Sequence, residues 1–270
     1  MDDIQLQYEG YLKTPLLWKN RDILGLQQLE LQIQSPTKFK ESIPDHTRLG
    51  KRVERFVSAV LNQHENIEIL LENAQIKHDK ITIGEIDCIL KQNGVPVHLE
   101  IIYKFYLYDP QCGTNEMDHW VGPNRKDSLV QKLKKLKDKQ LPLIYKEQLK
   151  QVLDVLYVKS EDIVQRVCFK AQLFMPYQAN NDDLILVNKD CVKGFYINYA
   201  DIGQFSHCQF HIPTKANWLI EIQAKVDWIS FLQFKDSITP QILEKRAPLC
   251  WIRHPDGFTE KIFVVWWSRQ

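Results

Sequence analysis

The sequence has no long run of apolar residues. No stretch of the 270-residue chain approaches the roughly 20 apolar residues that a membrane-spanning helix needs. The first residues also lack the basic and apolar segments of a secretion signal. We therefore expect a soluble, cytoplasmic protein without a membrane partner.

Closely spaced cysteines and nucleotide-binding motifs are missing as well. The six cysteines are scattered and form no CxxC pair, which argues against a disulfide framework and for reduced thiols. The Walker A and GxGxxG patterns do not occur, and no local Ser/His/Asp or Cys/His signature is present. The cluster of His207, Cys208 and His211 is read as a buried strand in preference to a zinc site, because no second group of ligands accompanies it.

An excess of charge is a further absence. The chain has 35 Lys and Arg against 34 Asp and Glu, so any surface for a nucleic acid has to be local. A hydrophobic fraction of 44% in a chain of this length is enough for one large core or two smaller ones.

The first half of the chain reads as helix, three strands and helix. An amphipathic stripe predicts a helix over residues 49–61. Runs rich in Ile, Val, Leu and aromatic residues predict strands over 67–71, 81–90 and 95–107. A second apolar stripe predicts a helix over 129–136, and the whole indicates an α/β (α+β) fold with a mixed sheet flanked by helices.

The second half is expected to be rich in strands and in tryptophan. After a helix-like segment over 147–157, apolar runs predict strands over residues 164–177, 184–187, 194–199, 208–212, 218–234, 249–253 and 262–267. We therefore expect three parts: a partly helical arm (1–46), a core (47–150), and a β-rich region (151–270) that either extends the core sheet or forms a subdomain.

A hairpin with opposing carboxylates is the most specific feature. Asn93-Gly94 between alternating apolar residues predicts a type I′ turn, and residues equally distant from that turn face each other. Asp87 then faces Glu100, with Cβ atoms roughly 5 Å apart. Two charges 4 Å apart repel by about 4 kcal/mol at an effective dielectric of ~20, and a Mg²⁺ or Mn²⁺ ion would offset that repulsion. The competing interpretation is a solvated face on the open side of a two-layer sheet.

Two further side chains are expected on the same face of the hairpin as Asp87 and Glu100. Period-two alternation puts Glu85 and His98 on the carboxylate face as candidate supporting residues.

Between residues 125 and 139, seven of fifteen residues are basic, which indicates either phosphate contacts or a solvated helix face. The candidates for nucleic-acid binding are Arg125, Lys126, Lys134 and Lys135. The tryptophans of the second half are either base-stacking or core residues, and the core interpretation is preferred.

Four segments resemble a known family. They are LGKRVERFV (49–57), GEIDCIL (84–90), HLEIIYKFYL (98–107) and WVGPNRKDSLVQKLKKLKDKQLPL (120–143). Together they resemble an uncharacterised bacterial family that is assigned to the PD-(D/E)XK, or restriction-endonuclease-like, nuclease superfamily. The resemblance implies a nuclease-like core and a metal-dependent nuclease acting on nucleic acid, with DNA as the expected substrate.

The resemblance also implies roles for individual residues. Asp87 and Glu100 match the motif carboxylates that hold the metal. Glu54 matches the acidic residue of the first core helix and is expected as a third metal ligand, with an exposed helix glutamate as the alternative.

The motif lysine is displaced in this sequence. Its usual position is Ile102, whereas Lys104 lies two residues farther along the strand. Lys132 on the following helix is the alternative, with Asp127 and Gln131 as further polar candidates. The displaced lysine keeps open a catalytically inactive protein that binds nucleic acid or serves as a scaffold. A protein-interaction module is a third hypothesis, and the oligomeric state stays open.

Overall fold

The structure is a computed structural model that describes residues 3–31 and 38–267. These residues form helices and a mixed sheet, so the predicted α+β class is confirmed. They pack into two compact units. The hairpin unit holds residues 16–103 and 131–170, and the terminal unit holds 1–15, 104–130 and 171–270. The units reflect packing alone, so the three consecutive parts expected from the sequence stay a prediction.

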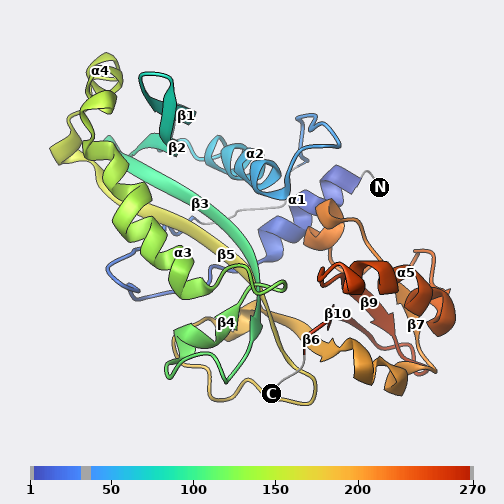
Figure 1. Cartoon of the computed structure of the whole chain (residues 1–270). Coiled ribbons are helices and arrows are strands. Elements are labelled where there is room, and N and C mark those ends of the chain that lie inside the picture. The colour runs from blue at the N-terminus through green and yellow to red at the C-terminus, as the bar shows by residue number, and fades with distance from the viewer. Residues whose placement is uncertain (1–2, 32–37, 268–270) are drawn as a thin grey trace. The chain divides into compact units, whose positions relative to one another are not determined.

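Figure 1 shows the elements along the chain. The α-helices are α1 (Asp3–Lys13), α2 (Leu49–Leu61), α3 (Leu129–Lys135), α4 (Glu147–Val155) and α5 (Phe231–Leu243). The strands are β1 (Ile67–His78), β2 (Ile81–Gln92), β3 (Val95–Tyr108), β4 (Trp120–Val121), β5 (Val164–Pro176), β6 (Val192–Asn198), β7 (Gln209–His211), β8 (Ile229–Ser230), β9 (Leu249–Arg253) and β10 (Thr259–Val265). A π-helical turn, η2 (Leu136–Gln140), and a 3-10 turn, η3 (Leu141–Tyr145), follow α3.

Helix α2 has the bounds that the apolar stripe predicts. The stripe residues Val53, Phe56 and Val57 are at most 1% exposed, and Phe56 meets Phe39 edge to face with ring centroids 5.0 Å apart. Helix α2 contacts β1, beside which it lies in Figure 1. Burial of this stripe, and not helix propensity alone, is what stabilises a helix of this length.

The β2–β3 hairpin has the predicted turn and register. Asn93 has φ 51° and Gly94 has φ 80°, as both central residues of a type I′ turn require. The strands pair from Gln92↔Val95 at the turn to Cys88↔Leu99, which is the register deduced from the turn. Strand β2 pairs along its other edge with β1 and is therefore an inner strand.

Both faces of this hairpin are covered by helical segments. On one face Gly84 lies against Leu143 of η3, within a cluster of apolar residues from β1, β2, η3 and α4. On the other face Glu85 is bonded by Lys51 of α2. The interpretation of the acidic face as the open side of a two-layer sheet is therefore wrong, and Glu100 is 0% exposed.

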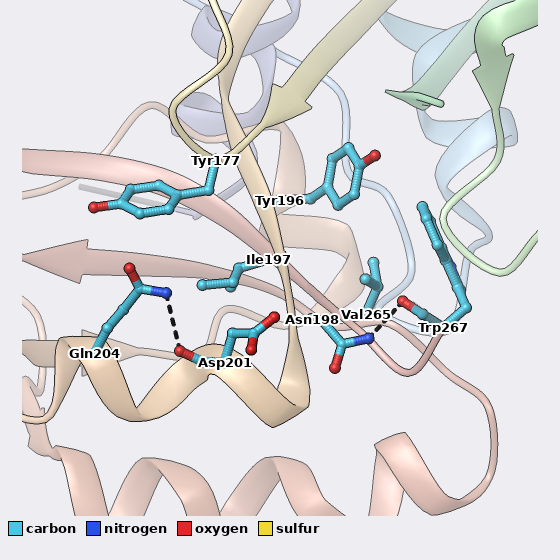
Figure 2. Close-up of a pocket in the computed structure, with 8 residues that line it drawn as sticks. All are labelled: Tyr177, Tyr196, Ile197, Asn198, Asp201, Gln204, Val265 and Trp267. Carbon is cyan, nitrogen blue, oxygen red and sulfur yellow. Dashed lines mark hydrogen bonds between the residues drawn. The ribbon is translucent and has the colours of Figure 1, made fainter. Parts of the chain in front are cut away.

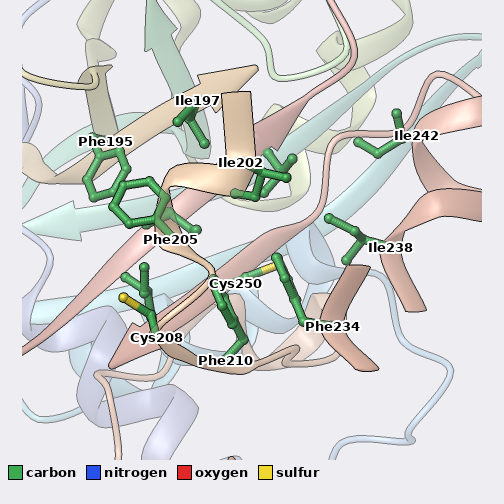
Figure 3. Packing of buried hydrophobic residues seen from close by; sticks show 13 residues of the cluster. Phe195, Ile197, Ile202, Phe205, Cys208, Phe210, Phe234, Ile238, Ile242 and Cys250 are labelled. Carbon is green, nitrogen blue, oxygen red and sulfur yellow. The ribbon is translucent and has the colours of Figure 1, made fainter. Parts of the chain in front are cut away.

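The terminal unit contains the strand order β6-β10-β9-β7-β8. Strand β10 pairs in parallel with β6 and antiparallel with β9. One face of these strands packs with α5 and the 3-10 segment Tyr199–Phe205 in the hydrophobic cluster drawn in Figure 3. Trp251 and Trp267 are buried, which favours a core role for these tryptophans.

The predicted strand over 218–234 is wrong for most of its length. Only Ile229–Ser230 is extended, and helix α5 begins at Phe231. The Ser230 side chain accepts the backbone N–H of Gln233, and the Gln233 side chain accepts the backbone N–H of Ser230. This capping box starts a helix within the apolar run that predicts a strand.

The predicted strand over 184–187 is wrong for a different reason. The Glu116 carboxylate accepts the backbone N–H groups of Ile185, Leu186 and Val187 at 2.8–2.9 Å. These N–H groups are therefore not available to a neighbouring strand, and the segment stays irregular. The side chain that prevents pairing lies about 70 residues away in the sequence.

Two absences concern the residues that the structure describes. All six cysteines are free. Within 3–31 and 38–267, none of the helices has both the length and the apolar character needed to span a membrane.

The turn predicts the effect of two glycine substitutions. Gly94→Ala should lower the free energy of unfolding by about 1 kcal/mol, because an L residue with φ near 80° is strained although its Cβ would meet no atom within 4 Å. Gly50→Ala is the matched control, since Gly50 lies exposed in α2 with equally open space; there alanine should stabilise the helix. Urea unfolding measures both, and equal effects would contradict the turn assignment.

Candidate functional site

Asp87 lies just beyond the last paired residues of the hairpin. Its Oδ2 atom accepts the backbone N–H of Ile101 at 2.9 Å. The Ile101 N–H is therefore bonded to a side chain instead of to a backbone carbonyl of the neighbouring strand. Burial raises the pKa of Asp87 to about 7, and the negative charges of Glu100 and Glu54 act in the same direction. The carboxyl group of Asp87 therefore binds a proton more readily than an exposed aspartate does.

Glu100 is the most enclosed carboxylate of the site. Its Oε1 atom lies 3.1 Å from Nε2 of His98, which is also 0% exposed, and its Oε2 atom accepts the side-chain amide of Gln140. His98 Nδ1 has no partner among the described residues. Because a carboxylate only accepts, His98 donates through Nε2, and both oxygens of Glu100 are held.

Gln140 connects Glu100 to a lysine. Lys132 of α3 donates to Gln140 Oε1 at 2.8 Å, so Lys132, Gln140 and Glu100 form one hydrogen-bonded chain. An α turn takes 3.6 residues and a π turn about one residue more, so the eight residues from Lys132 to Gln140 make about two turns. The π turn η2 thus brings Gln140 onto the face of Lys132. Sequence reasoning missed Gln140 because helical periodicity does not reveal a π turn.

A second group of charges lies between α2 and the strands. Lys51 donates to Glu54 at 2.7 Å, to Asn73 at 2.9 Å and to Glu85. Burial raises the pKa of Glu54, and the charges of Glu85 and Glu100 add to this effect against the opposing Lys51. Glu54, expected as a third metal ligand, is thus bonded to Lys51, which the sequence reasoning did not select.

The remaining candidates occupy other places. Lys104 forms an ion pair with Asp127 at 2.6 Å in the terminal unit. Gln131 is exposed on α3 in the hairpin unit. Of the two lysines proposed for the missing motif position, Lys132 is the one that hydrogen bonds through Gln140 link to Glu100 within the hairpin unit.

The basic residues are divided in the same way. Arg125 and Lys126 belong to the terminal unit, whereas Lys134 and Lys135 are exposed on α3 in the hairpin unit. Arg125 pairs with Asp109 at 2.6 Å and lies over the Trp267 ring, 4.6 Å from its centroid. Arg125 therefore has internal partners, and the three lysines are the more accessible cations.

An aromatic cavity lies in the terminal unit (Figure 2). Its volume is about 300 Å³, and Tyr177, Tyr196 and Trp267 line it together with the Asp201 carboxylate. The Trp267 indole donates to the Pro123 carbonyl at 3.1 Å, so this ring is fixed in place. The cavity is large enough for a small ligand, but none of the expected site residues lines it.

The donors near Asp87 fit a hard divalent cation in kind. Mg²⁺ is usually held by one or two carboxylates together with water and substrate phosphates, and Asp87 and Glu100 supply two carboxylates. A cation would also relieve the like-charge repulsion that raises the pKa of Asp87. Among the residues that the structure describes, no group of three or more His, Cys, Asp or Glu side chains is arranged to hold a metal.

The comparisons with known proteins identify the family. The chain belongs to the family defined by a domain of unknown function (DUF1853), whose model matches residues 13–265. Comparison with curated proteins and comparison with solved structures gave no match.

The raised pKa of Asp87 predicts a pH-dependent stability. The folded-state pKa of about 7 lies above the unfolded value of roughly 3.9, so the stability from proton binding is fully present below the unfolded value and is lost as pH rises through 7. Asp87→Asn keeps an acceptor for Ile101 without the charge. It should therefore raise Tm by about 5 °C at pH 8, with a smaller gain at pH 5.

Thermal unfolding without divalent cations measures this gain. Asp138→Asn is the control, because Asp138 is exposed in the same unit. A gain from Asp87→Asn that is the same at pH 5 and pH 8 would show that the Asp87 charge does not destabilise the fold.

Proposed function

We propose that this protein is a metal-dependent phosphodiesterase of the PD-(D/E)XK type, acting on nucleic acid, with DNA as the substrate. The observation that carries the proposal is the carboxylate pair of Asp87 and Glu100 on adjacent strands, with Glu100 linked through Gln140 to Lys132. This arrangement combines two hard oxygen donors and one cation, which metal-assisted phosphodiester hydrolysis uses.

Asp87 and Glu100 would hold Mg²⁺ or Mn²⁺ in this proposal. When bound, such an ion polarises the phosphate and lowers the pKa of a coordinated water. The chain's own residues do the positioning: His98 and Gln140 fix the two oxygens of Glu100, and the Ile101 N–H fixes Asp87. Asp87 is partly exposed, so a substrate would approach the site from the Asp87 side.

Lys132 takes the place of the displaced motif lysine. The side-chain amide of Gln140 connects the Lys132 ammonium to Glu100. The positive charge of Lys132 offsets part of the negative charge of the site. Lys134 and Lys135, exposed on the same helix, are the candidates for contacts with the phosphate backbone.

One observation favours a second candidate function, an inactive nuclease-like protein that binds nucleic acid. Glu100 is 0% exposed, and both its oxygens already accept hydrogen bonds. A protein that has lost hydrolysis could keep this network as a structural element, since buried polar groups are costly unless they are fully bonded.

Cleavage assays test the catalytic proposal. Purified protein should cleave single-stranded, double-stranded or branched DNA with Mn²⁺, and the Asp87→Asn/Glu100→Gln variant should be slower by about 100-fold or more, because the metal loses both carboxylates. The matched control is Glu68→Gln/Asp138→Asn, which removes two exposed charges from the same unit.

The outcomes separate the candidates. Equal cleavage by the protein and the carboxylate variant rules out the proposed site. No cleavage of any substrate, together with salt-dependent DNA binding in a mobility-shift assay, supports the inactive binding protein.

The two lysines give a separate prediction. Lys132→Met should lower the cleavage rate by roughly 10- to 100-fold, as changes to residues that support metal ligands do. Lys104→Met should change the rate little, because Lys104 is engaged by Asp127. A loss confined to Lys104→Met would assign the motif lysine to Lys104 instead.

A further inference from the structure

Three side chains of the terminal unit form a chain of polar contacts that the carboxylate site does not use. His254 Nδ1 lies 3.7 Å from Cys208 Sγ, and His254 Nε2 lies 3.2 Å from Glu260 Oε2. Cys208 is 3% exposed, whereas His254 and Glu260 are partly exposed. A thiol, an imidazole and a carboxylate in this order are the parts of a nucleophile, its base and the group that orients the base.

Strand register explains why these residues meet. Strands β7 and β9 pair as Gln209↔Arg253 and Phe210↔Ile252, so Cys208 stands beside His254 one step farther along. Strands β9 and β10 pair as Ile252↔Glu260, which puts Glu260 on the same face, two residues from His254. The sequence shows no local signature because the three residues belong to three different segments.

The sulfur of Cys208 lies at the margin of the hydrophobic cluster. In Figure 3 it points away from Phe210 and Phe234, whereas the sulfur of Cys250 lies among the rings. The residues on both sides of Cys208, His207 and Gln209, are exposed. Cys208 itself is 3% exposed, and its neighbour His254 is partly exposed.

The imidazole of His254 is held in one orientation. A tight turn closes next to it, with the His254 N–H donating to the Phe258 carbonyl at 2.8 Å and the Gly257 N–H donating to the His254 carbonyl at 2.9 Å. The Phe258 ring stacks on His254 at a centroid distance of 5.9 Å and is 58% exposed. With Nε2–H donated to Glu260, Nδ1 carries the lone pair that faces the thiol.

The charges around the thiol set its resting state. Burial raises the pKa of Cys208, and the charge of Asp256 in the neighbouring turn adds to that rise. The other titratable groups facing it are His254 and, beyond the ring, Glu260. Cys208 therefore rests as a thiol, and its attack on an electrophile requires a base to take the proton.

We propose that Cys208 is an acyl-accepting nucleophile, with His254 as its general base and Glu260 as a positioning residue, and that its substrates are activated carbonyl compounds of the ester or thioester class. A cavity of about 310 Å³, lined by Glu260, Tyr177 and Phe195 among others, lies at the end of the triad opposite Cys208.

The reaction balances with these groups and water alone. Cys208 Sγ forms a bond to the carbonyl carbon while its proton passes to His254 Nδ1. The bond from that carbon to the alcohol or thiol breaks, and the leaving group takes the proton from His254. Water then attacks the thioester with His254 as base, which releases a carboxylic acid and restores the thiol.

Acetyl transfer from p-nitrophenyl acetate tests this proposal in the full-length protein. All proteins carry Cys112→Ser, because Cys112 is the one partly exposed cysteine. Release of p-nitrophenolate gives the rate, and mass spectrometry of peptides locates the acetyl thioester. The acetyl group should be found on Cys208, and Cys208→Ser should abolish that thioester.

Variants of the partners distinguish catalysis from structural support. His254→Gln should lower the rate of Cys208 acetylation by about 100-fold, the contribution of a general base. Glu260→Gln should shift the midpoint of the pH–rate profile, since it changes the charge next to His254. Cys250→Ala is the matched control, because Cys250 is a 0% exposed thiol of the same cluster; it should leave the rate unchanged.

Each remaining outcome contradicts the proposal. An acetyl group absent from Cys208 in the folded protein, as judged by circular dichroism, rules out the nucleophile. Equal acetylation of Cys208 in the protein and in His254→Gln rules out the base, and an unshifted pH profile in Glu260→Gln rules out the positioning role.

Discussion

Burial of the Glu100 carboxylate is the constraint on which the candidate site depends. A carboxylate without exposure is stable only if its oxygens are hydrogen-bonded, and its partners come from two segments: His98 on the same strand and Gln140 at the end of a π turn. The helix after β3 must therefore end at a fixed position on the sheet. Lys132 follows from this placement, because it bonds the amide that reaches Glu100.

The parts of the fold that could be predicted from the sequence are those governed by local rules. The stripe of α2 and the Asn93-Gly94 turn gave an element and a register that the structure confirms. The wrongly predicted strand over 184–187 has a cause distant in the sequence, and the one over 218–234 has a local cause. Glu116 takes the N–H groups of the first segment from far along the chain, and a two-residue capping box inside the second outweighs its apolar character.

The candidate site was predictable only where spacing fixes geometry. Period two along β2 and β3 predicts Asp87 and Glu100 on one face. The pairing observed in the structure ends at Cys88 and Leu99, and the charge of Glu100 adds to the raised pKa of Asp87. Gln140 could not be found, because a π turn has no sequence signal of its own. The contacts of Cys208 with His254 were equally hidden, since they arise from the pairing of strands more than 40 residues apart.

The Glu116 contact has a consequence for association between chains. The segment 184–187 is apolar, and Ile185 is 73% exposed, so it has the composition of a strand that could pair with another molecule. Three of its backbone donors are bound to a carboxylate. A strand from another molecule would have to displace the Glu116 carboxylate before it could pair with these N–H groups. Glu116 therefore protects this exposed apolar segment from edge-to-edge aggregation.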